Sequence, residues 1–184
     1  MLDLFKNIDE SWTLFLDRDG VINQQIMGGY VQTWEGFHIL PGVLESMAVF
    51  SRVFGKIIVV TNQQGVGKKL MDETALRQIH HQLRLEVQQA GGRLDAIYYC
   101  PDLVLKPGNC RKPGIAMAMQ AKNDFPEINF SKSIMVGDSD SDMQFGKNAG
   151  MYTVFVGEHD IAGFNPDLCV GNLFEFSKLF NRSL

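Results

Sequence analysis

The chain has 184 residues, of which 45% are hydrophobic and 21% charged, as is typical of a single globular domain over residues 1–184. Its formal net charge is −4, and the absence of a basic stripe excludes nucleic acid as the main partner. No run approaches the roughly 18 apolar residues of a membrane span, so we expect no membrane partner. We also expect the protein to be a monomer.

The chain alternates short β-forming runs with amphipathic helical segments. In chain order, we expect a strand at 13–16, a helix at 43–53, a strand at 56–60, a helix at 72–89, strands at 96–99 and 133–136 on either side of a helix at 114–123, a helix at 141–149, strands at 152–156 and 168–170, and a last helix through Phe174, Phe176, Leu179 and Phe180. Asp72 is a candidate N-cap of the helix at 72–89, and Pro113 is placed to open the helix at 114–123. Gly150 is expected to end the helix at 141–149. This alternation predicts an α/β, Rossmann-like three-layer fold with a mostly parallel central sheet.

The stretch 13–23, Thr-Leu-Phe-Leu-Asp-Arg-Asp-Gly-Val-Ile-Asn, is the part around which the chain is organised. Its apolar run ends by presenting two carboxylates, Asp17 and Asp19. Gly20 then lets the backbone turn tightly or come close to a ligand. Ligand sites in open parallel sheets lie at this carboxyl edge. Taken alone, the same residues fit an Asp-rich turn after a plain strand equally well.

Three more polar clusters follow later segments in the same way: Thr61, Lys112, and Asp138 with Asp142. A carboxylate such as Asp17 can accept a phosphoryl group, and a second carboxylate can exchange protons with the leaving oxygen and with water. A threonine hydroxyl can hold phosphoryl oxygens, and a lysine can neutralise transition-state charge. Clustered carboxylates repel one another and favour a bound Mg²⁺. Each cluster alone fits a turn, a solvated lysine or an acidic helix cap, but the four together indicate phosphoryl transfer.

In combination these motifs resemble the haloacid dehalogenase superfamily of phosphohydrolases. The motifs are Asp17-Arg18-Asp19-Gly20-Val21-Ile22, Thr61-Asn62-Gln63, Cys110-Arg111-Lys112-Pro113 and Gly137-Asp138-Ser139-Asp140-Ser141-Asp142. More narrowly, the chain is similar to the branch that contains the heptose 1,7-bisphosphate phosphatases and the histidinol-phosphate phosphatase domain. The resemblance covers about residues 12–170.

The resemblance implies a role for each motif residue. Asp17 would be the nucleophile and a Mg²⁺ ligand. Asp19 would be the general acid and base, and would also bind Mg²⁺ through its backbone carbonyl. Thr61 and Lys112 would hold the transferring phosphoryl group, and Asp138 would complete the metal site.

The resemblance also implies how substrate is selected. Asn62 and Arg111 fall where the branch contacts substrate. The segments between the motifs are too short for the large cap domain of the superfamily. A small phosphorylated metabolite would then be selected mainly by the loops at 24–38 and 100–110.

Two departures from the branch affect these expectations. The branch usually holds a structural Zn²⁺ with three cysteines and a histidine, but only Cys100 and Cys110 remain here, with Asp102 at the histidine position and Gly108 near another cysteine position. Such a set is a poor match to a closed zinc site, so we expect no structural Zn²⁺ and two free, partly buried thiols. An odd total of three cysteines favours a reducing, cytoplasmic location. Ser139 replaces the lysine that heptose phosphatases usually carry.

Four functions compete for this pattern. The leading one is a Mg²⁺-dependent phosphomonoesterase acting on a small sugar phosphate, heptose 1,7-bisphosphate above all. Histidinol phosphate is the alternative substrate, although the loop at 24–38 offers only Glu35 as a partner for its amine. A receiver-type signalling domain shares much of the chemistry, but Asp19 argues against it. A fourth interpretation takes residues 65–69 as a nucleotide-binding loop, but they lack the full Gly-x-x-x-x-Gly-Lys-Ser/Thr pattern. We therefore expect Lys68 and Lys69 to attract a distal phosphate or to face water.

Overall fold

The computed structural model describes residues 5, 7–157 and 165–180. In this part of the chain six strands form one parallel sheet in the order β3-β2-β1-β4-β5-β6, which confirms the predicted fold class. The strands are β1 (Thr13–Leu16), β2 (Lys56–Asn62), β3 (Ala96–Cys100), β4 (Ser133–Gly137), β5 (Tyr152–Val156) and β6 (Leu168–Val170).

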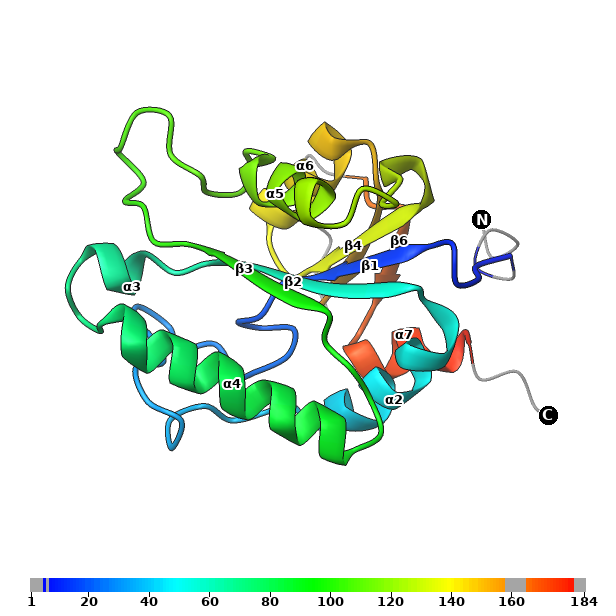
Figure 1. Ribbon diagram of the computed structural model, residues 1–184, viewed down its shortest axis with the longest axis horizontal. Helices are drawn as coiled ribbons and strands as arrows, with labels where there is room; N and C mark the ends of the chain where they lie inside the picture. Colours follow the sequence, from blue (N-terminus) through cyan, green and yellow to red (C-terminus); the bar gives the residue numbers. More distant parts are fainter. Residues whose placement is uncertain (1–4, 6, 158–164, 181–184) are drawn as a thin grey trace.

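Helices cover both faces of the sheet, as Figure 1 shows. On one face lie α2 (Val43–Val53), α4 (Glu73–Gln89) and α7 (Leu173–Lys178); on the other lie α5 (Ala116–Asp124) and α6 (Asp140–Ala149). The short α3 (Gln64–Gly67) follows β2, and a 3-10 turn, η1 (Phe130–Lys132), precedes β4. Among the described residues, no helix combines the length and the apolar character needed to cross a membrane.

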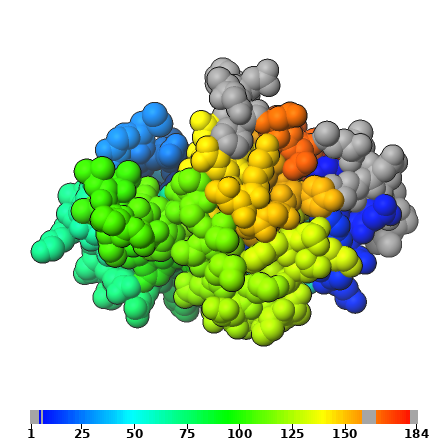
Figure 2. All heavy atoms as spheres, turned by 90° about the horizontal axis from the view of Figure 1, so that it is seen from above, coloured from blue at the N-terminus to red at the C-terminus, as the bar shows by residue number. Residues whose placement is uncertain are grey.

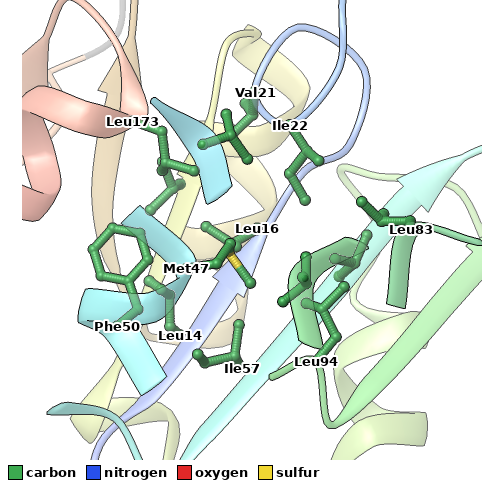
Figure 3. Packing of buried hydrophobic residues seen from close by; sticks show 14 of the residues in the cluster. Leu14, Leu16, Val21, Ile22, Met47, Phe50, Ile57, Leu83, Leu94 and Leu173 are labelled. Carbon is green, nitrogen blue, oxygen red and sulfur yellow. The ribbon is translucent and has the colours of Figure 1, made fainter. Parts of the chain in front are cut away.

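The period-two alternation of β1 explains its central place. Leu14 and Leu16 pack into the cluster under α2, α4 and α7 (Figure 3), whereas Phe15 points into the cluster on the opposite face. All three side chains are buried. Burying each contributes about 1.5–3 kcal/mol, so this short apolar run is held between two layers of helices.

The register of the sheet determines which side chains meet at its carboxyl edge. Leu16 pairs with Val59 of β2 on one side and Val136 of β4 on the other. The N–H of Asp17 then donates to the carbonyl of Val136 at 2.9 Å, which extends the ladder by one residue. The strand order reverses between β1 and β4, and ligands bind at such a switch point in open α/β sheets.

Most element boundaries agree with the sequence, and the differences have local causes. β2 continues to Asn62 because its ladder with β3 reaches Cys100. The carboxylate of Asp72 accepts from the N–H of Ala75 at 2.6 Å, as expected of an N-cap. Gly150 ends α6 with φ 80°, the left-handed region that favours glycine.

One helix starts later than expected. The helix predicted over 114–123 begins two residues further on, because the chain before it forms a turn in which the N–H of Gly114 donates to the carbonyl of Arg111 at 2.8 Å. The side chain of Asn62 binds the N–H and the carbonyl of Lys112, at 3.0 and 3.3 Å, and holds this segment outside the helix.

The expectation of two free thiols is wrong. Cys100, the last residue of β3, and Cys110 form a disulfide with Cα atoms 5.5 Å apart. Asp102 fastens the same loop by accepting from the N–H of Cys110 at 3.1 Å. The odd cysteine count excludes only complete pairing, and the residue left over is the exposed, free Cys169.

Candidate active site

A cavity of about 530 Å³ opens at the carboxyl edge of the sheet. In Figure 2 the blue loop after β1 and the green segment after β3 both lie toward the left end of the molecule. Every residue predicted for the site lines the cavity: Asp17, Asp19, Thr61, Asn62, Arg111, Lys112 and Asp138. The fold therefore brings the whole predicted set together.

Lys112 connects two carboxylates beneath the cavity. Its Nζ lies 2.6 Å from Asp17 and 2.6 Å from Asp142, and it donates to the carbonyl of Val60 at 2.8 Å. Burial by itself lowers the pKa of Lys112, but Asp142 and Asp17 outweigh it and raise that pKa above its usual value. The lysine is therefore charged and pointed at the predicted nucleophile.

Asp17 and Asp138 are carboxylates whose burial opposes ionisation. Burial, opposed by Lys112, raises the pKa of Asp17 to about 8. Burial and the nearby Asp142 raise the pKa of Asp138 to about 6. The carboxylate oxygens of Asp17, Asp138 and Asp142 lie within 4.8 Å of one another. With Lys112 included, the four ionised groups carry a formal charge of −2, which a divalent cation would neutralise.

The donor set fits a hard cation such as Mg²⁺. One oxygen of Asp142 is paired with Lys112, and the other accepts from the N–H and hydroxyl of Ser139 at 3.2 and 2.5 Å. Asp17 and Asp138 are therefore the better candidates as ligands, together with carbonyl and water oxygens. The backbone approaches them closely, since a Cβ placed on Gly20 would lie 1.8 Å from the Asp138 carboxylate and φ there is 93°.

Asp142 is the residue that the sequence prediction left out of the site. The sequence placed it in the same acidic cluster as Asp138, but gave it no role. It lies in the first turn of α6, where it forms a capping box with the N-cap residue Ser139 and reaches Lys112. Its spacing of four residues from Asp138 was the available signal, because the first turn of a helix can return to the strand end before it.

Asp19 is held by donors from three residues. Arg18 Nη2 donates to both of its carboxylate oxygens at 2.8 and 2.9 Å, while Asn23 and Gln63 donate at 2.9 and 2.7 Å. Burial alone would raise the pKa of Asp19, but these contacts, with Arg18 foremost, lower it below its usual value. The carboxylate is therefore ionised and fixed in orientation at the cavity wall.

Thr61 and Asn62 line the cavity from the end of β2. The hydroxyl of Thr61 accepts from the amide of Gln63 at 2.8 Å, and the same amide nitrogen holds Asp19. Asn62, predicted to contact substrate, has its amide engaged with the backbone of Lys112. Its observed contacts therefore position the lysine.

The outer wall of the cavity carries positive charge. Lys68 Nζ lies 3.0 Å from the hydroxyl of Tyr30 and 5.4 Å from the centre of its ring. Arg111 is partly buried, with Nη1 donating to the carbonyl of Asp102 at 3.3 Å. Among the described lining residues, Lys68 is exposed, whereas the carboxylates are buried, at Asp17 and Asp142, or partly buried, at Asp19 and Asp138. The mouth therefore suits a second anionic group.

The two loops expected to select substrate contribute differently. Residues 25, 26 and 28–31 of the first loop line the cavity. Residues 100–110 are not among the residues that line it, so their part in substrate selection stays a prediction. This second loop acts through Arg111, whose N–H donates to Asn109 at 3.0 Å and whose guanidinium binds the carbonyl of Asp102.

Comparisons with known proteins find phosphatases that are similar to this chain. A model of the HAD-hydrolase-like family matches residues 109–173. The chain is 35% identical over 170 residues to a D-glycero-alpha-D-manno-heptose-1,7-bisphosphate 7-phosphatase of Mycobacterium tuberculosis, with 90% of each chain covered. It is 33% identical over 154 residues to a D-glycero-D-manno-heptose-1,7-bisphosphate 7-phosphatase of Thermosynechococcus vestitus, covering 78% of this chain and 77% of the relative.

Two solved structures have the same fold at somewhat lower identity. The D,D-heptose 1,7-bisphosphate phosphatase from B. bronchiseptica, complexed with magnesium and phosphate, superposes with a TM-score of 0.82 at 27% identity, covering 91% of this chain and 96% of that one. The corresponding phosphatase from Burkholderia thailandensis gives a TM-score of 0.66 at 26% identity, covering 92% and 97%.

Proposed function

The chain belongs to the haloacid dehalogenase superfamily of phosphatases, in the branch of the heptose 1,7-bisphosphate phosphatases, and from this premise we propose that it is a Mg²⁺-dependent phosphatase of D-glycero-D-manno-heptose 1,7-bisphosphate. The observation that carries the proposal is the ion pair of 2.6 Å between Lys112 and Asp17 inside the cavity. It presents a carboxylate and a cation together at the ligand-binding edge of the sheet.

In the proposed reaction, Asp17 attacks phosphorus and forms an aspartyl-phosphate while the bond to the sugar oxygen breaks. Asp19 gives a proton to that oxygen and afterwards takes one from the attacking water. A substrate phosphate next to Asp19 favours its protonated form, because like charges repel. Lys112 and Thr61 hold the phosphoryl oxygens as negative charge develops on them.

Mg²⁺, held by Asp17, Asp138 and the backbone carbonyl of Asp19, would supply electrostatic stabilisation of the phosphoryl group. The fit rests on the raised pKa values of Asp17 and Asp138 and on the −2 charge of the cluster. Both features make ionised carboxylates costly in the protein alone.

The distribution of charge supports a bisphosphate over histidinol phosphate. Arg111 and Lys68 line the mouth of the cavity, where a distal phosphate would meet them. Glu35, the acidic residue expected to receive the amine of histidinol phosphate, is exposed and does not line the cavity. A receiver domain is disfavoured because the chain belongs to a family of hydrolases and Asp19 reaches the same cavity as Asp17.

We also propose that the protein works as a cytoplasmic monomer on this small metabolite, without nucleic acid or membrane. The net charge of −4 supports only the absence of nucleic acid and of an anionic membrane surface among the partners, since both are negatively charged. Size-exclusion chromatography with light scattering tests the monomer, and a dimer mass would contradict it.

The test of function is phosphate release by the purified protein from heptose 1,7-bisphosphate, histidinol phosphate and simple sugar monophosphates, with Mg²⁺ or EDTA. We expect many turnovers of the bisphosphate with Mg²⁺, little with EDTA, and no turnover by the Asp17→Asn variant. Phosphate release from histidinol phosphate alone would identify that compound as the substrate in place of the bisphosphate. Retention of one phosphate per protein without turnover would indicate a receiver-type signalling domain.

A further inference from the structure

Arg18, between the two motif aspartates, is the largest of the fully buried side chains described. Its guanidinium meets three different partners. Nη2 forms the two bonds to Asp19, Nη1 lies 3.2 Å from Nε2 of His80, and Cζ lies 5.5 Å from the centre of the Phe37 ring. The Nε atom is buried with no hydrogen-bond partner. Arg18 is therefore oriented toward Asp19 at the cost of one unpaired donor.

His80 approaches Arg18 from the buried face of α4, 62 residues away in the chain. Burial and Arg18 lower the pKa of His80 to about 3, so the imidazole is neutral. Arginine can only donate, so Nε2 of His80 accepts and its proton resides on Nδ1. The ring of Tyr99 lies 5.9 Å from the imidazole and limits its movement. His80 is thus the acceptor for Nη1 of Arg18, while Nη2 of the same guanidinium holds Asp19.

We propose that Arg18 and His80 are positioning residues for Asp19: α4 holds His80, His80 orients the guanidinium, and the guanidinium fixes the Asp19 carboxylate at the cavity wall. The inference rests on the role of Asp19 in the proposed function. In the step concerned, the proton on the Asp19 carboxyl moves to the sugar oxygen as the P–O bond breaks and the phosphoryl group joins Asp17. Proton transfer of this kind depends on sub-ångström placement.

The leaving group separates positioning from ordinary structural support. The sugar oxygen of heptose 1,7-bisphosphate needs a proton in order to leave, whereas the 4-nitrophenolate of 4-nitrophenyl phosphate leaves without one. The quantity kcat/KM reports the steps up to the aspartyl-phosphate, where the two substrates differ. A misplaced Asp19 therefore slows the sugar substrate selectively, while a loosened fold slows both.

The experiment compares kcat/KM for these two substrates, with Mg²⁺, in His80→Leu and His80→Gln. We expect His80→Leu to lose about tenfold or more on the sugar substrate and less than about twofold on 4-nitrophenyl phosphate. His80→Gln retains an acceptor oxygen and should recover to within about threefold of wild type. The matched control is His81→Leu, the exposed neighbour on the same helix, which should change neither value.

Arg18→Lys provides a second variant if His80→Leu does not fold, because it keeps the charge but has no second nitrogen to reach His80 while the first holds Asp19. Equal losses on both substrates, or no loss, in the variants that fold would overturn the positioning role. Asp19→Asn separates this result from failure of the proposed function. If Asp19→Asn shows no selective loss, the acid assignment itself fails. If it does while His80→Leu and Arg18→Lys do not, only the positioning inference fails.

Discussion

Asp142 and Lys112 form a buried ion pair of 2.6 Å that joins the first turn of α6 to the turn before α5. The same lysine holds Asp17, so the position of the predicted nucleophile depends on a carboxylate outside the expected site.

We predict that Asp142→Asn destabilises the protein by about 1–3 kcal/mol, because Lys112 loses one of its two buried carboxylate partners and keeps Asp17. Urea unfolding without Mg²⁺ measures this loss. Asp140→Asn is the control, because Asp140 is exposed in the same helical turn and should change stability by about 0.5 kcal/mol or less. Equal effects of the two substitutions would contradict the structural role of the pair.

The stabilising effect of Mg²⁺ should increase with pH. The folded-state pKa values of Asp17 and Asp138, about 8 and about 6, lie above their ordinary value of 3.8. Between 3.8 and these values the folded protein binds more protons than the unfolded chain, so these two groups make the metal-free protein less stable as pH rises. A bound cation requires the ionised carboxylates and opposes that loss.

Thermal unfolding at pH 5.5 and pH 8, with EDTA or saturating Mg²⁺, measures this linkage. We expect a larger Mg²⁺-induced rise in Tm at pH 8. Asp138→Asn should remove most of the difference between the two pH values. A rise independent of pH in the wild-type protein would rule out the carboxylate cluster as the binding site.

Reduction of the disulfide should loosen the support of Arg111 more than that of Lys112. The disulfide joins Cys100 to Cys110, which are 10 residues apart in the sequence. A cross-link over such a loop contributes about 2–3 kcal/mol to the free energy of unfolding. Lys112 keeps its contacts with Asn62 when the bond is broken, while Arg111 depends on the loop. The variant with both cysteines replaced by serine should therefore have a lower Tm and a higher KM, with kcat changed less. Cys169→Ser is the control, and the same KM in both variants would exclude a role of the disulfide in substrate binding.

The cationic mouth predicts a substrate-dependent effect of Lys68→Ala. Losing one charged contact to a distal phosphate costs about 1.5–3 kcal/mol, so KM for a bisphosphate should rise about tenfold or more. A sugar monophosphate lacks the second phosphate and should show little change. Lys69→Ala is the neighbouring control, since Lys69 does not line the cavity. Parallel changes for both substrates would place the distal phosphate elsewhere.

The sequence alone predicted the sheet and the convergence of its strand ends. Leu14, Phe15 and Leu16 form an apolar run that must be buried on both faces, and a parallel sheet collects the residues after such runs at one edge. Asp17 and Asp138 were predictable as neighbours for this reason, since each directly follows a strand.

Only the tertiary structure decided the contacts between residues distant in the chain. Lys112 lies 95 residues from Asp17, and His80 lies 62 from Arg18. The pairing of Cys100 with Cys110 likewise depended on where the end of β3 places the sulfur of Cys100. Sequence periodicity reports which face of an element is buried, but the partner of a buried polar side chain is chosen by how that element packs against the others.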